Sequence, residues 1–233
     1  MAKSESELHQ SLAQSNFNDC IMTEKLYNWS PICIEASKIT LHYKGSIPQL
    51  DFIGTFEEVP SGRVKFCSQS LRLEHSTTRK LNQKYSKYSS GILSYFEDKI
   101  SFLRRELAMM DLESSSLVCH MVHYIDWYIS RIEMTGKELS ILENRFKGKV
   151  YMQNEKDGSH YLEMQFNKES GDEFIVGCFE ICDSYPFAGL DVTIKGNVDV
   201  EALERHLSKN SKPGFGYLSR TCDVFSVFCK SSI

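Results

Sequence analysis

The sequence has no long apolar run and no marked excess of charge, and each absence removes a class of function. No stretch of the 233 residues approaches the roughly 18 consecutive apolar side chains that a membrane span requires. Lys and Arg number 27 against 31 Asp and Glu, a net charge of −4, whereas nucleic-acid binding relies on concentrated positive charge. We therefore expect a chain that neither crosses a membrane nor binds nucleic acid directly.

The residue patterns of three common chemistries are also missing. No glycine-rich loop follows a strand and opens a helix, as a phosphate-binding site would require. Cys119 and His123 stand one helical turn apart, but no second pair of ligands accompanies them to complete a zinc site. A ubiquitin-conjugating enzyme needs a reactive cysteine in a loop, whereas Cys222 falls among apolar residues of an expected helix, which disfavours a thiolate. We expect no catalysis, no metal, no cofactor and no small-molecule substrate.

The N-terminus carries no apolar signal region. The eight cysteines lie mostly inside apolar stretches, such as residues 176–182, where a free cysteine acts as a small buried hydrophobe. We therefore expect no disulfide framework. We expect a cytosolic or nuclear protein.

One long amphipathic helix organises the chain, over residues 115–146. Apolar side chains recur there at steps of three or four residues, the spacing of one helical face. Such a helix would be roughly 45 Å long, which exceeds a typical globular helix and predicts that it serves more than one core. The face consists of Leu117, Met121, Tyr124, Tyr128, Ile132, Leu139, Leu142 and Phe146.

The residues before this helix predict a small antiparallel sheet and one further helix. Residues 1–28 are polar, and a short helix is one interpretation of part of them. Alternating apolar and polar side chains follow, separated by short turns, which is typical of an antiparallel meander. The expected strands are 38–43, 50–56 and 63–73, and the expected helix is 92–110.

The residues after it predict four more strands and two helices, with Asp157-Gly158 as a hairpin turn. Residues 184–189 read as an ordered turn after the third strand, which is nearly all apolar and therefore expected to be an inner strand. We assign a first domain to residues 29–113 and a second to 114–233. The expected strands are 150–152, 161–166, 174–182 and 190–195, and the expected helices are 200–209 and 217–228.

This order of elements, with Tyr185-Pro186 as the turn after the third strand, resembles the RWD family, non-catalytic relatives of ubiquitin-conjugating enzymes. The family's turn is Tyr-Pro, three residues, then Pro; here Leu190 stands at the second proline position. The resemblance implies an α+β fold of two RWD-like domains, each an antiparallel β-meander packed on helices, joined by the long central helix.

Two such domains in tandem are similar to the C-terminal region of the kinetochore scaffold family KNL1. Trp29, the helix 89–97, the end of the long helix at 136–143 and Tyr185-Pro186 carry this similarity. It implies a nuclear protein of the centromere and kinetochore that docks onto the Mis12 complex by binding a short peptide from one of its subunits. Such modules bind peptides by strand addition at a sheet edge or in a groove beside a helix.

Phe215, Tyr217 and Leu218 are the candidate partner-binding residues, because they are apolar and directly follow a break at Pro213-Gly214. The alternative is that they cap the core. Two other functions stay open: an RWD adaptor in another assembly, and an enzyme or cofactor of ubiquitin transfer.

Overall fold

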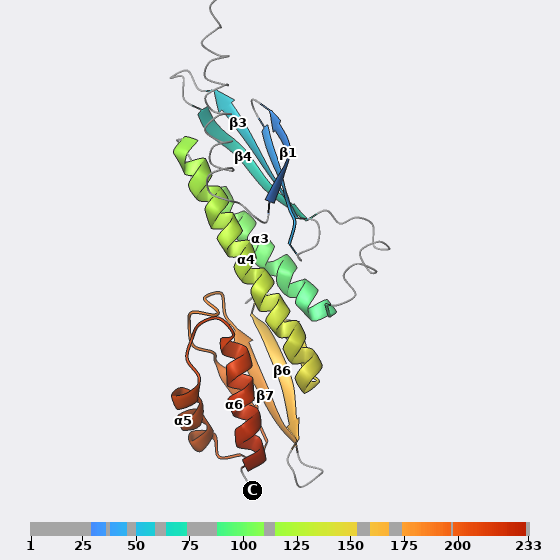
Figure 1. Ribbon diagram of the computed structural model, residues 1–233, viewed down its shortest axis with the longest axis vertical. Coiled ribbons are helices and arrows are strands. Elements are labelled where there is room, and N and C mark those ends of the chain that lie inside the picture. Colours follow the sequence, from blue (N-terminus) through green and yellow to red (C-terminus); the bar gives the residue numbers. More distant parts are fainter. Residues whose placement is uncertain are drawn as a thin grey trace, which may run out of the picture. The chain divides into compact units, whose positions relative to one another are not determined.

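The computed structural model describes residues 29–35, 38–45, 50–58, 64–73, 88–109, 115–152, 159–167, 174–196 and 198–231. The predicted helix within residues 1–28 and the Asp157-Gly158 turn lie outside these ranges. The described residues form four helices and two four-stranded antiparallel sheets (Figure 1). The expected α+β class is confirmed at this level. The chain divides into two compact units, residues 1–86 with 99–133 and residues 87–98 with 134–233.

The sheet of the first unit has one strand more than the sequence predicted. Trp29 was expected to precede the first strand but begins it, and β1 pairs with β2 as an edge strand. The register shifts between Pro31 and Cys33. A proline and a bulge interrupt the alternation of apolar and polar residues by which a strand is recognised in a sequence. An edge strand tolerates both. The order is β1(Trp29–Glu35), β2(Lys38–Tyr43), β3(Leu50–Glu58), β4(Val64–Leu73).

Two carboxylates of α4 (Ser115–Phe146) accept hydrogen bonds from two aromatic residues of this sheet. The indole Nε1 of Trp29 donates to Asp126 Oδ1 at 2.7 Å, and the Tyr43 hydroxyl donates to Glu133 Oε2 at 2.5 Å. Both rings are buried and lie 5.1 Å apart. A side chain at Gly45 would collide with the Tyr43 ring and the Glu133 carboxylate, so these groups would have to move to admit one. The Trp29 indole and the Tyr43 hydroxyl are thus both paired across elements, as buried polar groups usually are.

The long helix α4 has the bounds that its periodicity predicted. Of the predicted apolar face, Tyr128, Ile132, Leu139 and Leu142 are buried. The sequence placed the border between the halves at residue 114, whereas the compact units divide α4 after residue 133 and α3 (Ser90–Met109) after residue 98. Both helices are long enough to contribute to two cores. Among the described helices, none is long and apolar enough to cross a membrane.

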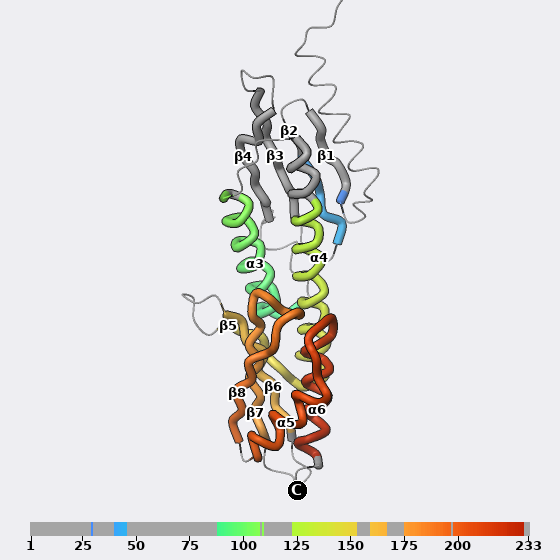
Figure 2. Tube along the Cα trace, turned by 90° about the vertical axis from the view of Figure 1, so that its left-hand side faces the viewer, coloured from blue at the N-terminus to red at the C-terminus, as the bar shows by residue number. Residues whose placement is uncertain are grey.

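The second unit contains the other sheet, with β7 as an inner strand, as its apolar sequence predicted. Alternate residues of the two inner strands are buried, and Leu162 and Phe179 have no exposed surface. Figure 2 shows the sheet with α5 and α6 beside it. The order is β5(Lys149–Met152), β6(His160–Asn167), β7(Phe174–Ile181), β8(Val192–Lys195).

Two C-terminal helices complete this unit, α5 (Val200–Asn210) and α6 (Tyr217–Ser231). Asp199 caps α5 by accepting a hydrogen bond from the Ala202 amide at 3.0 Å. The buried ring of Phe225 lies 4.4 Å from that of Phe166 and 5.8 Å from that of Phe179, so α6 covers the apolar face of the sheet. This packing holds α6 against the sheet and so also holds the loop that ends where α6 begins, at Tyr217.

Candidate functional site

Two loops of the second unit form the best candidate for a binding surface. The first follows β7 and contains the peptide bond between Tyr185 and Pro186, which is cis. The second joins α5 to α6. The Gly214 amide donates to the Pro186 carbonyl oxygen at 2.7 Å, so the two loops are bonded directly to each other. Gly214 has a φ of 132°, which side-chain-bearing residues rarely adopt.

Each loop presents one phenylalanine to solvent, and the two rings form an exposed aromatic pair. Phe187 is 52% exposed and Phe215 is 55% exposed. Their centroids lie 5.6 Å apart with an interplanar angle of 76°, an edge-to-face contact. Isolated apolar residues are common on protein surfaces, but adjacent large rings that stay half in water are typical of binding sites.

The rim of the aromatic pair is cationic. The guanidinium of Arg220 donates to the Phe215 carbonyl oxygen at 2.5 Å through Nη1 and to the Lys212 carbonyl oxygen at 2.9 Å through Nη2. These bonds fix the backbone on either side of Gly214 and leave the positive charge of Arg220 uncompensated by the carbonyls. Lys212 and Arg220 are both exposed. The surface therefore combines apolar rings with two positive charges.

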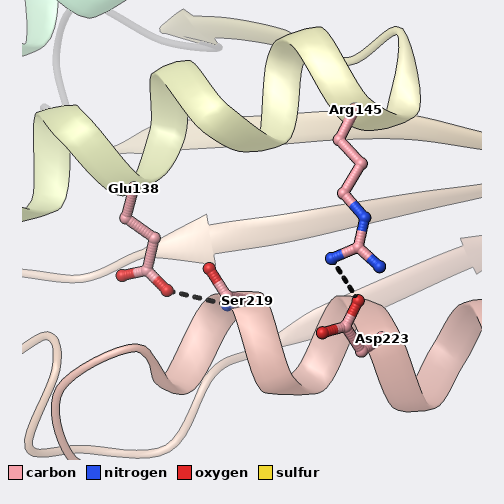
Figure 3. Close-up of polar contacts among 4 residues, drawn as sticks. All are labelled: Glu138, Arg145, Ser219 and Asp223. Carbon is pink, nitrogen blue, oxygen red and sulfur yellow. Dashed lines mark hydrogen bonds and ion pairs between the residues drawn. The ribbon is translucent and has the colours of Figure 1, made fainter.

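One carboxylate of α4, that of Glu138, is hydrogen-bonded to residues next to both loops. The buried Tyr185 hydroxyl donates to Glu138 Oε2 at 2.5 Å and accepts from the Leu218 amide at 3.0 Å. Burial, and then the adjacent Glu138 carboxylate, raise the pKa of Tyr185 above its ordinary value, so the hydroxyl stays a donor. The second oxygen of Glu138, Oε1, accepts from the Ser219 amide at 2.7 Å, in the first turn of α6 (Figure 3).

A second link between the same two helices is an ion pair. Arg145 Nη1 lies 2.6 Å from Asp223 Oδ1, two turns beyond Glu138 on α4 and one turn beyond Ser219 on α6 (Figure 3). Both side chains are about half exposed, and exposed pairs of this kind contribute little stability. The contacts of Glu138 are the stronger constraint on the start of α6.

The structure separates the three predicted partner-binding residues. Phe215 is exposed, Tyr217 is half-buried, and Leu218 has no exposed surface at all. Leu218 belongs to the core because α6 turns its side chain inward one residue after the helix begins. The predicted turn at Tyr185 and Pro186 is present, and both residues are buried.

Phe187 is the residue that sequence reasoning missed. Its neighbours Pro186, Ala188 and Gly189 indicate a turn, and a turn residue is normally treated as having no partner. The signal was available: a large aromatic side chain at the tip of a turn cannot be explained by turn geometry. Its contact with Phe215 lies 28 positions along the chain and leaves no local pattern.

Another exposed aromatic residue is a weaker candidate. Trp127, in the first unit, is 49% exposed. The guanidinium of Arg131, one turn later on the same helix, lies 4.9 Å from its ring centroid. A cation over an indole at this spacing is an ordinary stabilising pair of a helix surface, so Trp127 is already partly covered by its own helix.

Cys222 and Cys178, which lie in apolar stretches of the sequence, are packed in the core. Cys222 is buried, and burial raises the pKa of its thiol well above the ordinary value. Cys178 is buried with its Sγ 3.5 Å from the Tyr151 hydroxyl. The interpretation of both as core residues is confirmed. Among the side chains that the structure describes, no group of three His, Cys, Asp or Glu could hold a metal ion; the Cys119 side chain is not one of those described.

Comparison with protein-family models and with curated proteins finds no match to this chain.

Proposed function

We propose that the chain is a pair of RWD-like domains that acts as a non-catalytic docking module of the KNL1 kind in the outer kinetochore. Its partner is a short peptide of a Mis12 complex subunit, bound in the nucleus at the centromere. The aromatic pair of the second unit, Phe187 with Phe215, is the receptor surface.

The observation that carries this proposal is a half-exposed aromatic pair on a backbone that is already fixed. Hydrogen bonds hold the carbonyls of Pro186, Lys212 and Phe215, so the rings do not need to be ordered when a partner arrives. Preorganisation of this kind increases affinity, because less conformational entropy is lost on binding. Each ring keeps roughly 100 Å² of apolar surface for a partner to cover, half of what a phenylalanine can bury.

The charges at the rim indicate the chemistry of the peptide. We expect an apolar side chain that covers the two rings, followed by an acidic residue that approaches Lys212 and Arg220. An exposed charge pair contributes mainly to the rate and specificity of association, while the buried rings supply most of the affinity.

Strand addition is the alternative mode, and the sheet of this unit favours it less. β8 is an outer strand of only four residues, Val192–Lys195. At the other edge, the Val150 amide of β5 already donates to Glu143 Oε1 at 2.8 Å. Neither edge offers a long row of backbone groups to an added strand.

The experiment is calorimetric titration of the purified Mis12 complex into the full chain and its variants Phe215→Ala and Phe187→Ala. Truncation of one well-packed aromatic anchor costs about 2 kcal/mol or more, about thirtyfold in Kd. The melting temperature should stay close to that of the unmodified chain, because both rings are already half in water.

Ile141→Ala is the matched control, since Ile141 is an apolar residue of the same unit, 62% exposed on α4, and belongs to neither loop. It should bind like the unmodified chain. Equal binding by all four proteins would refute the aromatic pair as the receptor. An unmodified chain that does not bind the Mis12 complex would refute the kinetochore assignment itself.

A further inference from the structure

We propose that Glu138 is the positioning residue of this docking surface: one carboxylate on α4 ties both loops and so fixes the orientation of Phe187 against Phe215. The predicted effect of Glu138 on partner binding rests on the proposed function, whereas its effect on the orientation of the two rings does not. Glu138 contacts neither ring in the contacts described above and acts through the loops.

The first loop is tied to Glu138 through Tyr185, two residues before Phe187. The Tyr185 hydroxyl is 2.5 Å from Glu138 Oε2, and the ring is buried. A buried ring with its hydroxyl bonded to a charged acceptor has one preferred orientation, because every alternative leaves a buried polar group unpaired. The backbone that continues to Phe187 is therefore anchored at its start.

The second loop is tied to the same carboxylate at the beginning of α6. Glu138 Oε1 accepts from the Ser219 amide at 2.7 Å, and the Leu218 amide donates to the Tyr185 hydroxyl at 3.0 Å. These amides lie in the first helical turn, where backbone donors have no partner within the helix. A negative charge there is also favoured by the helix dipole. Phe215 lies just before this anchored turn.

Two donors, the Tyr185 hydroxyl and the Ser219 amide, each need an acceptor oxygen, so this position requires a carboxylate. The carboxylate accepts from the hydroxyl and the amide at once, whereas a glutamine has a single acceptor oxygen. Other charged groups of this region are the Arg145–Asp223 pair, which is already closed on itself, Arg220, which is bound to carbonyls, and the exposed Lys212. Without Glu138, the two segments are still joined by the bond from the Gly214 amide to Pro186, the bond from the Leu218 amide to the Tyr185 hydroxyl and the contact of the two rings, but no charged acceptor holds the Tyr185 hydroxyl and the start of α6 together.

The chain offers a matched control on the same helix. Glu143 Oε1 also accepts two hydrogen bonds, from the Ser89 hydroxyl at 2.9 Å and from the Val150 amide at 2.8 Å. It is a half-buried carboxylate of the same unit and likewise anchors a backbone amide, but it serves α3 and β5. Replacing it tests whether any loss of such a carboxylate has the same effect.

The experiment places 4-fluorophenylalanine at position 215 and records the ¹⁹F spectrum of the full chain. In the unmodified chain the Phe187 ring, 5.6 Å away, should shift the signal from that of the free amino acid. Glu138→Ala should move the signal toward the free value, and Glu138→Gln should retain part of the shift because one acceptor remains. Glu143→Ala should leave the signal unchanged, although it also lowers the melting temperature.

An unchanged signal in Glu138→Ala would overturn the inference, and so would an equal change in Glu143→Ala. If Glu138→Ala does not fold, Glu138→Gln is compared with Glu143→Gln. The ¹⁹F signal should change in the first and not in the second, and equal signals would overturn the inference.

Titration with the Mis12 complex then separates the two proposals. Glu138→Ala should bind about tenfold more weakly, since two ring-bearing loops must be ordered on binding. A changed ¹⁹F signal with no Mis12 binding by the unmodified chain refutes only the function. Binding that depends on Phe215 but not on Glu138, with an unchanged ¹⁹F signal, refutes only the positioning role.

Discussion

The substitution Gly91→Ala tests the packing of the second unit, because two effects of opposite sign compete. Gly91 is the second residue of α3. Alanine is a better helix former by up to about 1 kcal/mol. Its methyl group, however, would collide with the backbone of Val150, at 2.6 Å from the carbonyl carbon and in closer contact with the carbonyl oxygen.

The collision should win. Overpacking costs about 1–3 kcal/mol, and the upper end applies because the obstacle is backbone and cannot change rotamer. β5 cannot easily retreat either, since the Val150 amide is bonded to Glu143. After the helix gain is subtracted, the net loss is about 2 kcal/mol. For a chain of this size that lowers the melting temperature by about 4–8 °C.

Differential scanning calorimetry measures this, with Gly189→Ala as the control. Nothing lies within 4 Å of the methyl group that alanine would add at Gly189, so its stability should change by no more than about 0.5 kcal/mol. If Gly91→Ala melts at the same temperature as the unmodified chain or higher, the close approach of α3 to β5 is refuted.

Two further substitutions have definite expected outcomes. Burial raises the pKa of Asp126, more than the Trp29 hydrogen bond and His123 lower it. The stabilising contribution of its protonated form is therefore lost as pH rises through the raised pKa. Asp126→Asn, which keeps an oxygen for Trp29 and cannot ionise, should be at least as stable as the unmodified chain at neutral pH and lose this advantage in acid, as urea unfolding at several pH values would show. Leu218→Asp should lower the melting temperature sharply, because it places a carboxylate in the core; an unchanged melting temperature would contradict its burial.

Elements with strong periodicity could be predicted from the sequence. The apolar spacing of α4 gave its bounds, and an uninterrupted apolar run identified β7 as an inner strand. The spacing in α4 arises because one face of the helix is buried. The continuous apolar run of β7 is typical of a strand that is buried on both faces. β1 was missed because Pro31 interrupts its pattern and a bulge follows. An edge strand needs only one row of backbone hydrogen bonds, so its sequence is less constrained.

The candidate binding surface could be predicted only in part, because it depends on contacts between distant segments. Phe215 was found by its position after a break in the helix. For Leu218 the structure favours the alternative, a place in the core. The sequence could not decide this, because the direction of a side chain in the first turn depends on how α6 packs against Phe166 and Phe179. Glu138 has the spacing of an ordinary solvated residue on a helix, and only its two distant donors distinguish it.

The two units use the same kind of contact in different settings, and this supports our proposal that the second unit binds the partner. In each unit a tyrosine hydroxyl donates to a glutamate of α4: Tyr43 to Glu133, and Tyr185 to Glu138. Tyr43 lies within a strand, and the side chains it contacts, Trp29 and Glu133, are buried with it. Tyr185 lies in a loop that ends at a half-exposed ring. Loops carry binding residues when a rigid scaffold positions them, and only the second of these contacts connects the scaffold to a surface that a partner can reach.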